Sequence, residues 1–79
     1  MSALKVSEDL WSSAIMPEGI LERWHCDEGQ AVECGDPVAL VRIEDSLHEI
    51  LAPESGILHI LVAPNTVIDP GTWLGDITS

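Results

Sequence analysis

The chain has 79 residues, so it forms a single domain near the lower size limit at which a hydrophobic core alone stabilises a fold. Fourteen acidic residues against three basic ones give a formal charge of −11, which excludes nucleic acid and anionic lipid surfaces as partners. The acidic balance favours either simple solubility or attraction to basic protein surfaces. No secretory leader and no apolar run of membrane-spanning length is found, so we expect a cytoplasmic protein with reduced thiols.

Glycine or proline interrupts the chain too often for a helix of ordinary length, which favours an all-β fold. Between these interruptions lie strand-sized runs rich in Val, Ile and Leu, namely 19–25, 37–43, 47–52, 56–63 and 72–77. The second and third runs flank a short acidic segment. We therefore expect a hairpin there, with its tip at residues 44–46.

Side-chain alternation separates the two faces of this hairpin. The better candidate for the core face of the first strand is the apolar set Ala39, Val41 and Ile43. Leu40, Leu47 and Leu51 then fall on the outer, wetter face, where large apolar side chains are unexpected.

The chain contains an internal repeat. A Gly-Ile-Leu tripeptide at 19–21 returns at 56–58, and the sequence similarity continues through the next strand of each copy. We take 19–43 and 56–77 as the two copies within one domain, 1–79. Two copies are too few for a solenoid. Two strand-turn-strand units can instead pack around a pseudo-twofold axis, so that each copy pairs with the strand edges of the other.

Several short motifs occur in the order and register of a known family. They are Glu18-Gly19, Trp24, Asp27-Glu28-Gly29, Val32, Gly35-Asp36-Pro37, Ala39, Ala52-Pro53, Ser55-Gly56, Leu58, Ile60-Leu61-Val62, Gly71-Thr72, Leu74-Gly75 and Ile77. On these residues the chain resembles the biotinyl/lipoyl attachment domains, most of all the lipoyl domains of the acyltransferase components of 2-oxo acid and acetoin dehydrogenase complexes. The resemblance implies a flattened β-barrel or sandwich of two four-stranded antiparallel sheets with pseudo-twofold symmetry, and a carrier-type domain that is not itself an enzyme.

In that family the hairpin between the two copies carries a lysine whose amine is joined to lipoate by an amide bond, usually within an Asp-Lys-Ala triplet. Counting from Asp36-Pro37 and from Ala52-Pro53 places the triplet on Glu44-Asp45-Ser46, with Asp45 at the lysine position. A carboxylate cannot form this amide, and the only lysine in the sequence is Lys5. We therefore expect no lipoate or other cofactor, and interpret the chain as a non-lipoylated interaction module.

Such a module is expected to bind a protein partner, for which a dehydrogenase-complex component with a basic surface is the natural context and a homodimer a second option. The candidate contact residues are those of the tip, the outward leucines and a tryptophan of the first loop: Glu44, Asp45, Ser46, Leu47, Leu40, Leu51 and Trp11. Exposed apolar patches of this kind mark interfaces. The alternative is a true lipoyl or biotinyl carrier with an unrecognised attachment site.

Catalytic and metal-binding chemistry are disfavoured by spacing. The potential ligands fit no recognised zinc pattern; they are His25, Cys26, Cys34, His48 and His59. The Glu44–Asp45 pair lacks a partner base, and Ser46 lacks the His–Asp arrangement that activates a nucleophile. An enzyme using a cysteine or these carboxylates is the least favoured alternative.

Five further side chains have structural interpretations. We expect Cys26 and Cys34 to be small core fillers and Trp24 to lie in the core. We expect Trp73 to be partly exposed and His48 to be partly buried and hydrogen bonded.

Overall fold

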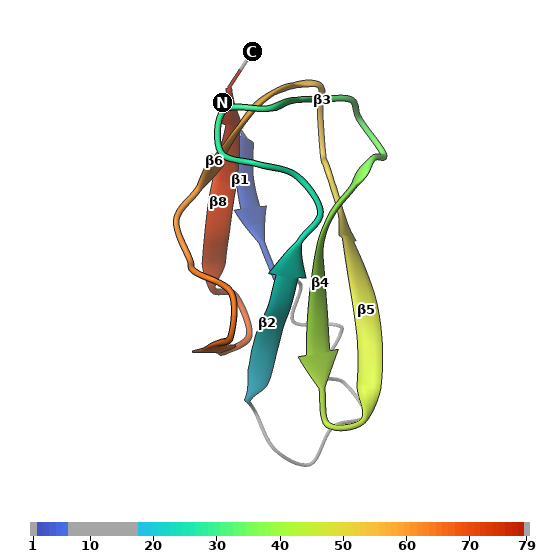
Figure 1. Ribbon diagram of the computed structural model, residues 1–79, viewed down its shortest axis with the longest axis vertical. Coiled ribbons are helices and arrows are strands. Elements are labelled where there is room, and N and C mark those ends of the chain that lie inside the picture. Colours follow the sequence, from blue (N-terminus) through green and yellow to red (C-terminus); the bar gives the residue numbers. More distant parts are fainter. Residues whose placement is uncertain (1, 7–17, 79) are drawn as a thin grey trace.

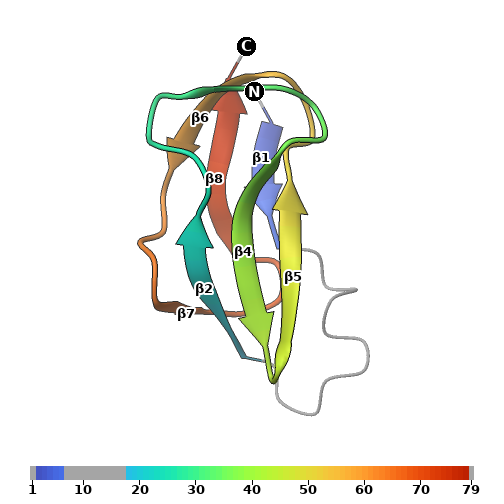
Figure 2. The ribbon, with the colours of Figure 1, turned by 45° about the vertical axis from the view of Figure 1, so that its right-hand side comes forward.

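The computed structural model describes residues 2–6 and 18–78. The strands are β1 (Ser2–Lys5), β2 (Gly19–Trp24), β3 (Ala31–Val32), β4 (Pro37–Ile43), β5 (Ser46–Leu51), β6 (Gly56–Ile60), β7 (Thr66–Ile68) and β8 (Trp73–Thr78). They form two antiparallel four-stranded sheets: sheet A, in the order β1-β8-β6-β3, and sheet B, in the order β5-β4-β2-β7. Figures 1 and 2 show the sheets stacked as a flattened sandwich. The predicted all-β class is confirmed, as a sandwich rather than a closed barrel.

The five apolar runs predicted as strands correspond to β2, β4, β5, β6 and β8. The predicted strand 56–63 is shorter in the structure, where β6 ends at Ile60. The chain bends there because the N–H groups of Leu61 and Val62 both donate to the carbonyl oxygen of Leu74, at 2.9 and 3.2 Å. In the part of the chain that is described, no helix is long and apolar enough to cross a membrane.

The two copies of the repeat exchange their short middle strands. β3 belongs to the first copy but pairs with β6 in sheet A, and β7 belongs to the second copy but pairs with β2 in sheet B. The turns that precede β4 and β8 are also alike. The Glu33 N–H donates to the carboxylate of Asp36 at 2.9 Å, and the Asp69 N–H donates to the Thr72 hydroxyl at 2.9 Å. The pseudo-twofold symmetry is thus visible in topology and in local hydrogen bonding.

The core lies between the sheets. Its buried members are Leu4, Val6, Leu21, Val32, Val38, Ala39, Val41, Ile43, Ile50, Ala52, Leu58, Ile68, Leu74 and Ile77. Trp24 packs against this cluster, and its indole N–H donates to the carbonyl oxygen of Val62 at 2.9 Å. Trp73 is half exposed, as predicted, and the Lys5 ammonium lies 5.2 Å from the centre of its ring.

One packing prediction is wrong and one is right in part. Cys34 is exposed rather than a core filler, because it lies in the turn between β3 and β4, where its N–H donates to the Ser55 hydroxyl at 3.0 Å. Cys26 packs against the core only half-buried. His48 is half-buried opposite Val41, but among the described residues its ring has no hydrogen-bond partner.

Candidate interaction site on the hairpin and sheet B

The β4–β5 hairpin projects from the end of the sandwich opposite the two chain termini (Figure 1). Pairing continues up to Ile43 and Ser46, so that Glu44 and Asp45 alone form the turn. Glu44 has a φ of 55°, in the left-handed region that a side chain with a Cβ rarely adopts. The chain therefore presents two acidic residues on a tight, projecting turn.

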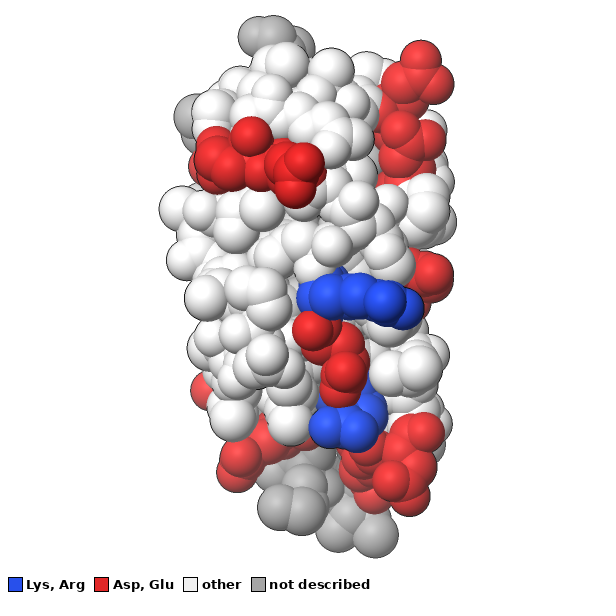
Figure 3. Space-filling model, in the orientation of Figure 1, with Lys and Arg blue, Asp and Glu red and all other residues white. Residues whose placement is uncertain are grey.

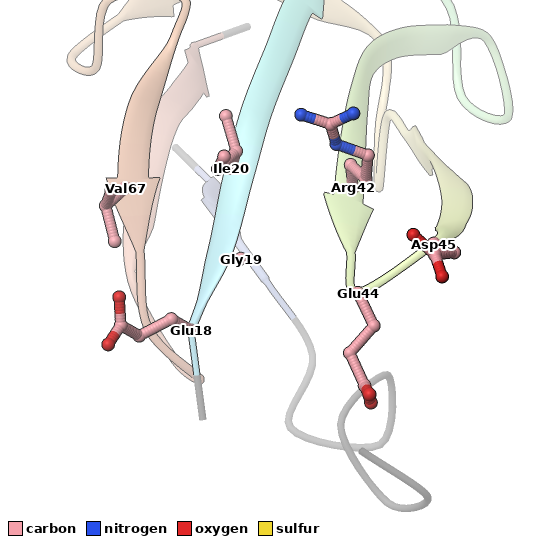
Figure 4. Close-up of a pocket in the computed structure, with 7 residues that line it drawn as sticks. All are labelled: Glu18, Gly19, Ile20, Arg42, Glu44, Asp45 and Val67. Atoms are coloured by element: carbon pink, nitrogen blue, oxygen red, sulfur yellow. The ribbon is translucent and has the colours of Figure 1, made fainter. Parts of the chain in front are cut away.

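The tip carries charge without the geometry of a catalytic pair. Glu44, Asp45 and Ser46 are all exposed. Figure 4 shows the carboxylates of Glu44 and Asp45 directed away from one another. Two exposed carboxylates that point apart cannot share a proton or hold a substrate between them, whereas both can contact cationic groups of a partner.

The apolar residues predicted on the outer face are found there. Leu47 is 59% exposed and Leu51 54% exposed on β5, and half-buried Leu40 lies on the neighbouring β4 opposite Glu49. The structure therefore brings the three leucines onto one sheet face. Trp11, the remaining candidate, lies outside the described residues.

Several polar residues of the same face were not foreseen. The Arg42 Nε lies 2.9 Å from the Glu22 carboxylate, and the His25 Nε2 lies 2.9 Å from the Glu49 carboxylate. The first pair joins β4 to β2, and the second joins β5 to the residue that follows β2. A register irregularity between Leu21 and Arg23 affects how β2 lies against β4. A sequence pattern alone does not contain that irregularity.

A hollow of about 290 Å³ opens beside the tip. Its lining joins the tip to the tip-proximal ends of β2 and β7, and consists of Glu18, Gly19, Ile20, Arg42, Glu44, Asp45 and Val67 (Figure 4). With three carboxylates and one arginine that is already paired with Glu22, the hollow favours cationic over anionic neighbours.

The remaining chemistry-bearing residues do not converge. Within residues 2–6 and 18–78, no group of three or more His, Cys, Asp or Glu side chains is placed to hold a metal ion. Partial burial, followed by the charges of Asp36 and Asp27, raises the pKa of the Cys26 thiol above its ordinary value, which disfavours the reactive thiolate.

Glu28 fastens the β2–β3 loop onto sheet A. Its carboxylate accepts a hydrogen bond of 2.6 Å from the Ile60 N–H and lies 3.1 Å from the Nδ1 of His59. The other ring nitrogen of His59 is 3.0 Å from the Thr78 hydroxyl. The bond from Ile60, with a smaller contribution from His59, lowers the pKa of Glu28 below its ordinary value of 4.5.

We expect this carboxylate to make stability depend on acid pH. Because its pKa is lower in the folded than in the unfolded protein, its contribution is complete above 4.5 and disappears as the pH falls through the folded value. Glu28→Gln should therefore melt at a lower temperature than the parent at neutral pH, and the gap should narrow in acid. Thermal denaturation followed by circular dichroism, from neutral to acid pH, measures the difference in melting temperature between the two proteins. A difference that stays constant at every acid pH would contradict the lowered pKa of Glu28.

Comparisons with known proteins agree with this architecture. The family model for biotin and lipoyl attachment domains, described as biotin-requiring enzyme, matches residues 12–77. The lipoyl domain of the 2-oxoglutarate dehydrogenase complex from Azotobacter vinelandii superimposes with a TM-score of 0.76 at 20% identity, over 98% of either chain. No curated protein sequence matches.

The chain belongs to the biotin/lipoyl attachment family. It is a domain of the carrier type, not a catalytic one, and the structural match extends over nearly its whole length. At 20% identity, that match shows the fold alone.

Proposed function

We propose that this domain has the carrier fold without the carrier chemistry, and that it serves as a protein-interaction module. The observation that supports this most is the residue at the turn of the β4–β5 hairpin. Asp45 occupies the position at which the family is expected to carry its lysine, and lipoate or biotin forms its amide with an amine. Lys5, the only lysine of the sequence, lies in β1 rather than on a turn.

The partner is a protein that offers cationic groups beside an apolar surface. Glu44 and Asp45 supply negative charge at the tip, and Leu47 supplies apolar area close to it. Leu40 and Leu51 continue the apolar area further along the same face, away from the tip. A component of a 2-oxo acid dehydrogenase complex is the natural context for such a partner, because the structurally similar lipoyl domain from Azotobacter vinelandii belongs to a 2-oxoglutarate dehydrogenase complex.

Intact-mass measurement after co-expression with a lipoate ligase, in the presence of lipoate, tests the loss of attachment. The parent should gain no lipoyl group, while Asp45→Lys should gain one, because the turn then presents an amine at the family position. Glu44→Lys and Ser46→Lys are matched controls, each placing an amine one residue away, and both should stay unmodified.

A lipoyl or biotinyl group on the parent would overturn the proposal and restore the carrier interpretation. Modification of a control variant in place of Asp45→Lys would show that the register at the tip is wrong. If all three variants stay unmodified, the tip has diverged beyond what the ligase recognises, which still agrees with a non-carrier function.

A further inference from the structure

The charged residues of this chain are distributed unevenly over its surface. The three basic residues are Lys5, Arg23 and Arg42, against fourteen acidic ones. Figure 3 shows basic side chains over the middle of this face and acidic groups toward both ends of the molecule. The chain therefore holds too few cations to neutralise its acidic ends, of which one is the tip of the β4–β5 hairpin.

The floor of the hollow beside this tip is apolar. Register places Ile20 of β2 opposite Val67 of β7. Val67 is 57% exposed and Ile20 is half-buried, and Gly19, the next lining residue, adds no side chain that would fill the space. Apolar surface is thus left in water at the floor, and covering it is favourable at roughly 25 cal/mol per Å².

The rim of the same hollow is acidic. Glu18 lies on one side, beside Val67, and Glu44 and Asp45 form the turn on the other side, with Gly19 between them (Figure 4). Among the described residues, neither the Glu18 nor the Asp45 side chain makes an ion pair or a hydrogen bond. Three carboxylates against one arginine give the lining a formal charge of −2. An apolar floor and a negative rim thus occur in one hollow.

We propose that this hollow receives a lysine or arginine side chain of a basic protein partner. The methylenes of that side chain lie over Ile20 and Val67, and its charged group lies between Glu18 and the tip. Long basic side chains cover apolar surface with their methylenes and keep the charge at a polar rim. An acidic side chain would be repelled by the rim, and an apolar one would take water from the carboxylates without giving them a partner.

The occupant is a different protein rather than a second copy of this chain. Two copies of formal charge −11 repel one another, whereas a basic protein is attracted to the tip. Of the three basic residues that a copy could offer, Arg42 and Lys5 are already engaged with Glu22 and Trp73. The inference rests on the proposed function, for which it places a cationic group of the partner in the hollow between the tip, β2 and β7.

Titration of the isotope-labelled protein with acetylated tetralysine amide, followed by the amide NMR spectrum at physiological ionic strength, tests the proposal. Shifts should concentrate at Gly19, Ile20, Asp45 and Val67. Exposed Glu33, in the turn between β3 and β4 at the other end of the molecule, is the internal control and should shift little. A peptide of diaminobutyric acid carries the same charges on stems two carbons shorter. It should bind at least ~3-fold more weakly, because it covers less of the apolar floor.

Matched variants test the rim and the floor separately. Glu18→Gln and Asp45→Asn should each weaken tetralysine binding by roughly 2–5-fold, the range of an exposed ion pair. Glu33→Gln removes the same charge at the other end and should leave binding nearly unchanged. Val67→Ser should abolish the preference for lysine over the shorter side chain, whereas Leu61→Ser, at 60% exposure against 57%, should keep it.

Three results would overturn the proposal: shifts spread evenly over the acidic residues of both ends, equal losses for Glu18→Gln and Glu33→Gln, or equal binding of the two peptides. Shifts of the hollow's amides on dilution of the protein alone would show that a second copy occupies it, and would overturn the proposal as well. None of these outcomes bears on the lipoate-ligase result, so the two proposals fail separately.

Discussion

Gly75→Ala should destabilise this protein by about 3 kcal/mol or more, a large part of the total of about 4–12 kcal/mol expected for a domain of this size. The reason is steric. A Cβ at Gly75 in β8 would collide with the backbone carbonyl oxygen of His59 in the paired strand β6. That oxygen is part of a backbone in the middle of sheet A, so it cannot move aside as a flexible side chain would.

Gly29→Ala provides the comparison. Gly29 has a φ of +81°, but nothing lies within 4 Å of an added Cβ, so the cost there is conformational strain of about 1 kcal/mol. Urea denaturation followed by tryptophan fluorescence measures both variants. Equal losses at the two positions would show that the collision in sheet A is relieved by movement of the strands.

Leu58→Ala should cost about 3 kcal/mol by leaving a cavity in the core. Leu58 is fully buried at the centre of β6, opposite Ile77. It belongs to the buried hydrophobic cluster, whose members come from both sheets. Leu61→Ala, at an exposed position three residues further on, should change stability by less than about 0.5 kcal/mol. The free energies of unfolding come from the same urea titrations, and similar values for the two variants would be incompatible with the core described.

The sequence predicted the long strands and the faces of the hairpin because both depend on local patterns. Alternation alone placed Val41 in the core and Leu47 outside. It could not specify β3, since two residues carry no measurable period and this strand exists only through its pairing with β6. The exposure of Cys34 was missed because the turn contacts that hold it come from residues about twenty positions away.

The charged contacts were less accessible to sequence reasoning than the strands. The pairing of Arg42 with Glu22 and the binding of the Ile60 N–H by Glu28 join residues 20 and 32 positions apart. Their meeting depends on the twist and register irregularities of the sheets, for which a single sequence holds no local signal. The acidic tip was predictable because a two-residue turn between paired strands depends only on nearby residues.

The exchange of β3 and β7 between the copies has a consequence for cooperativity. Sheet A takes β3 from the first copy of the repeat and sheet B takes β7 from the second copy, so neither sheet can be completed while the other copy is unfolded. Opening of either sheet by local fluctuation therefore releases backbone hydrogen bonds in both halves, and a partly folded state with one intact copy gains little stability. We therefore expect this small domain to unfold as one cooperative unit, because each copy supplies a strand to the sheet of the other.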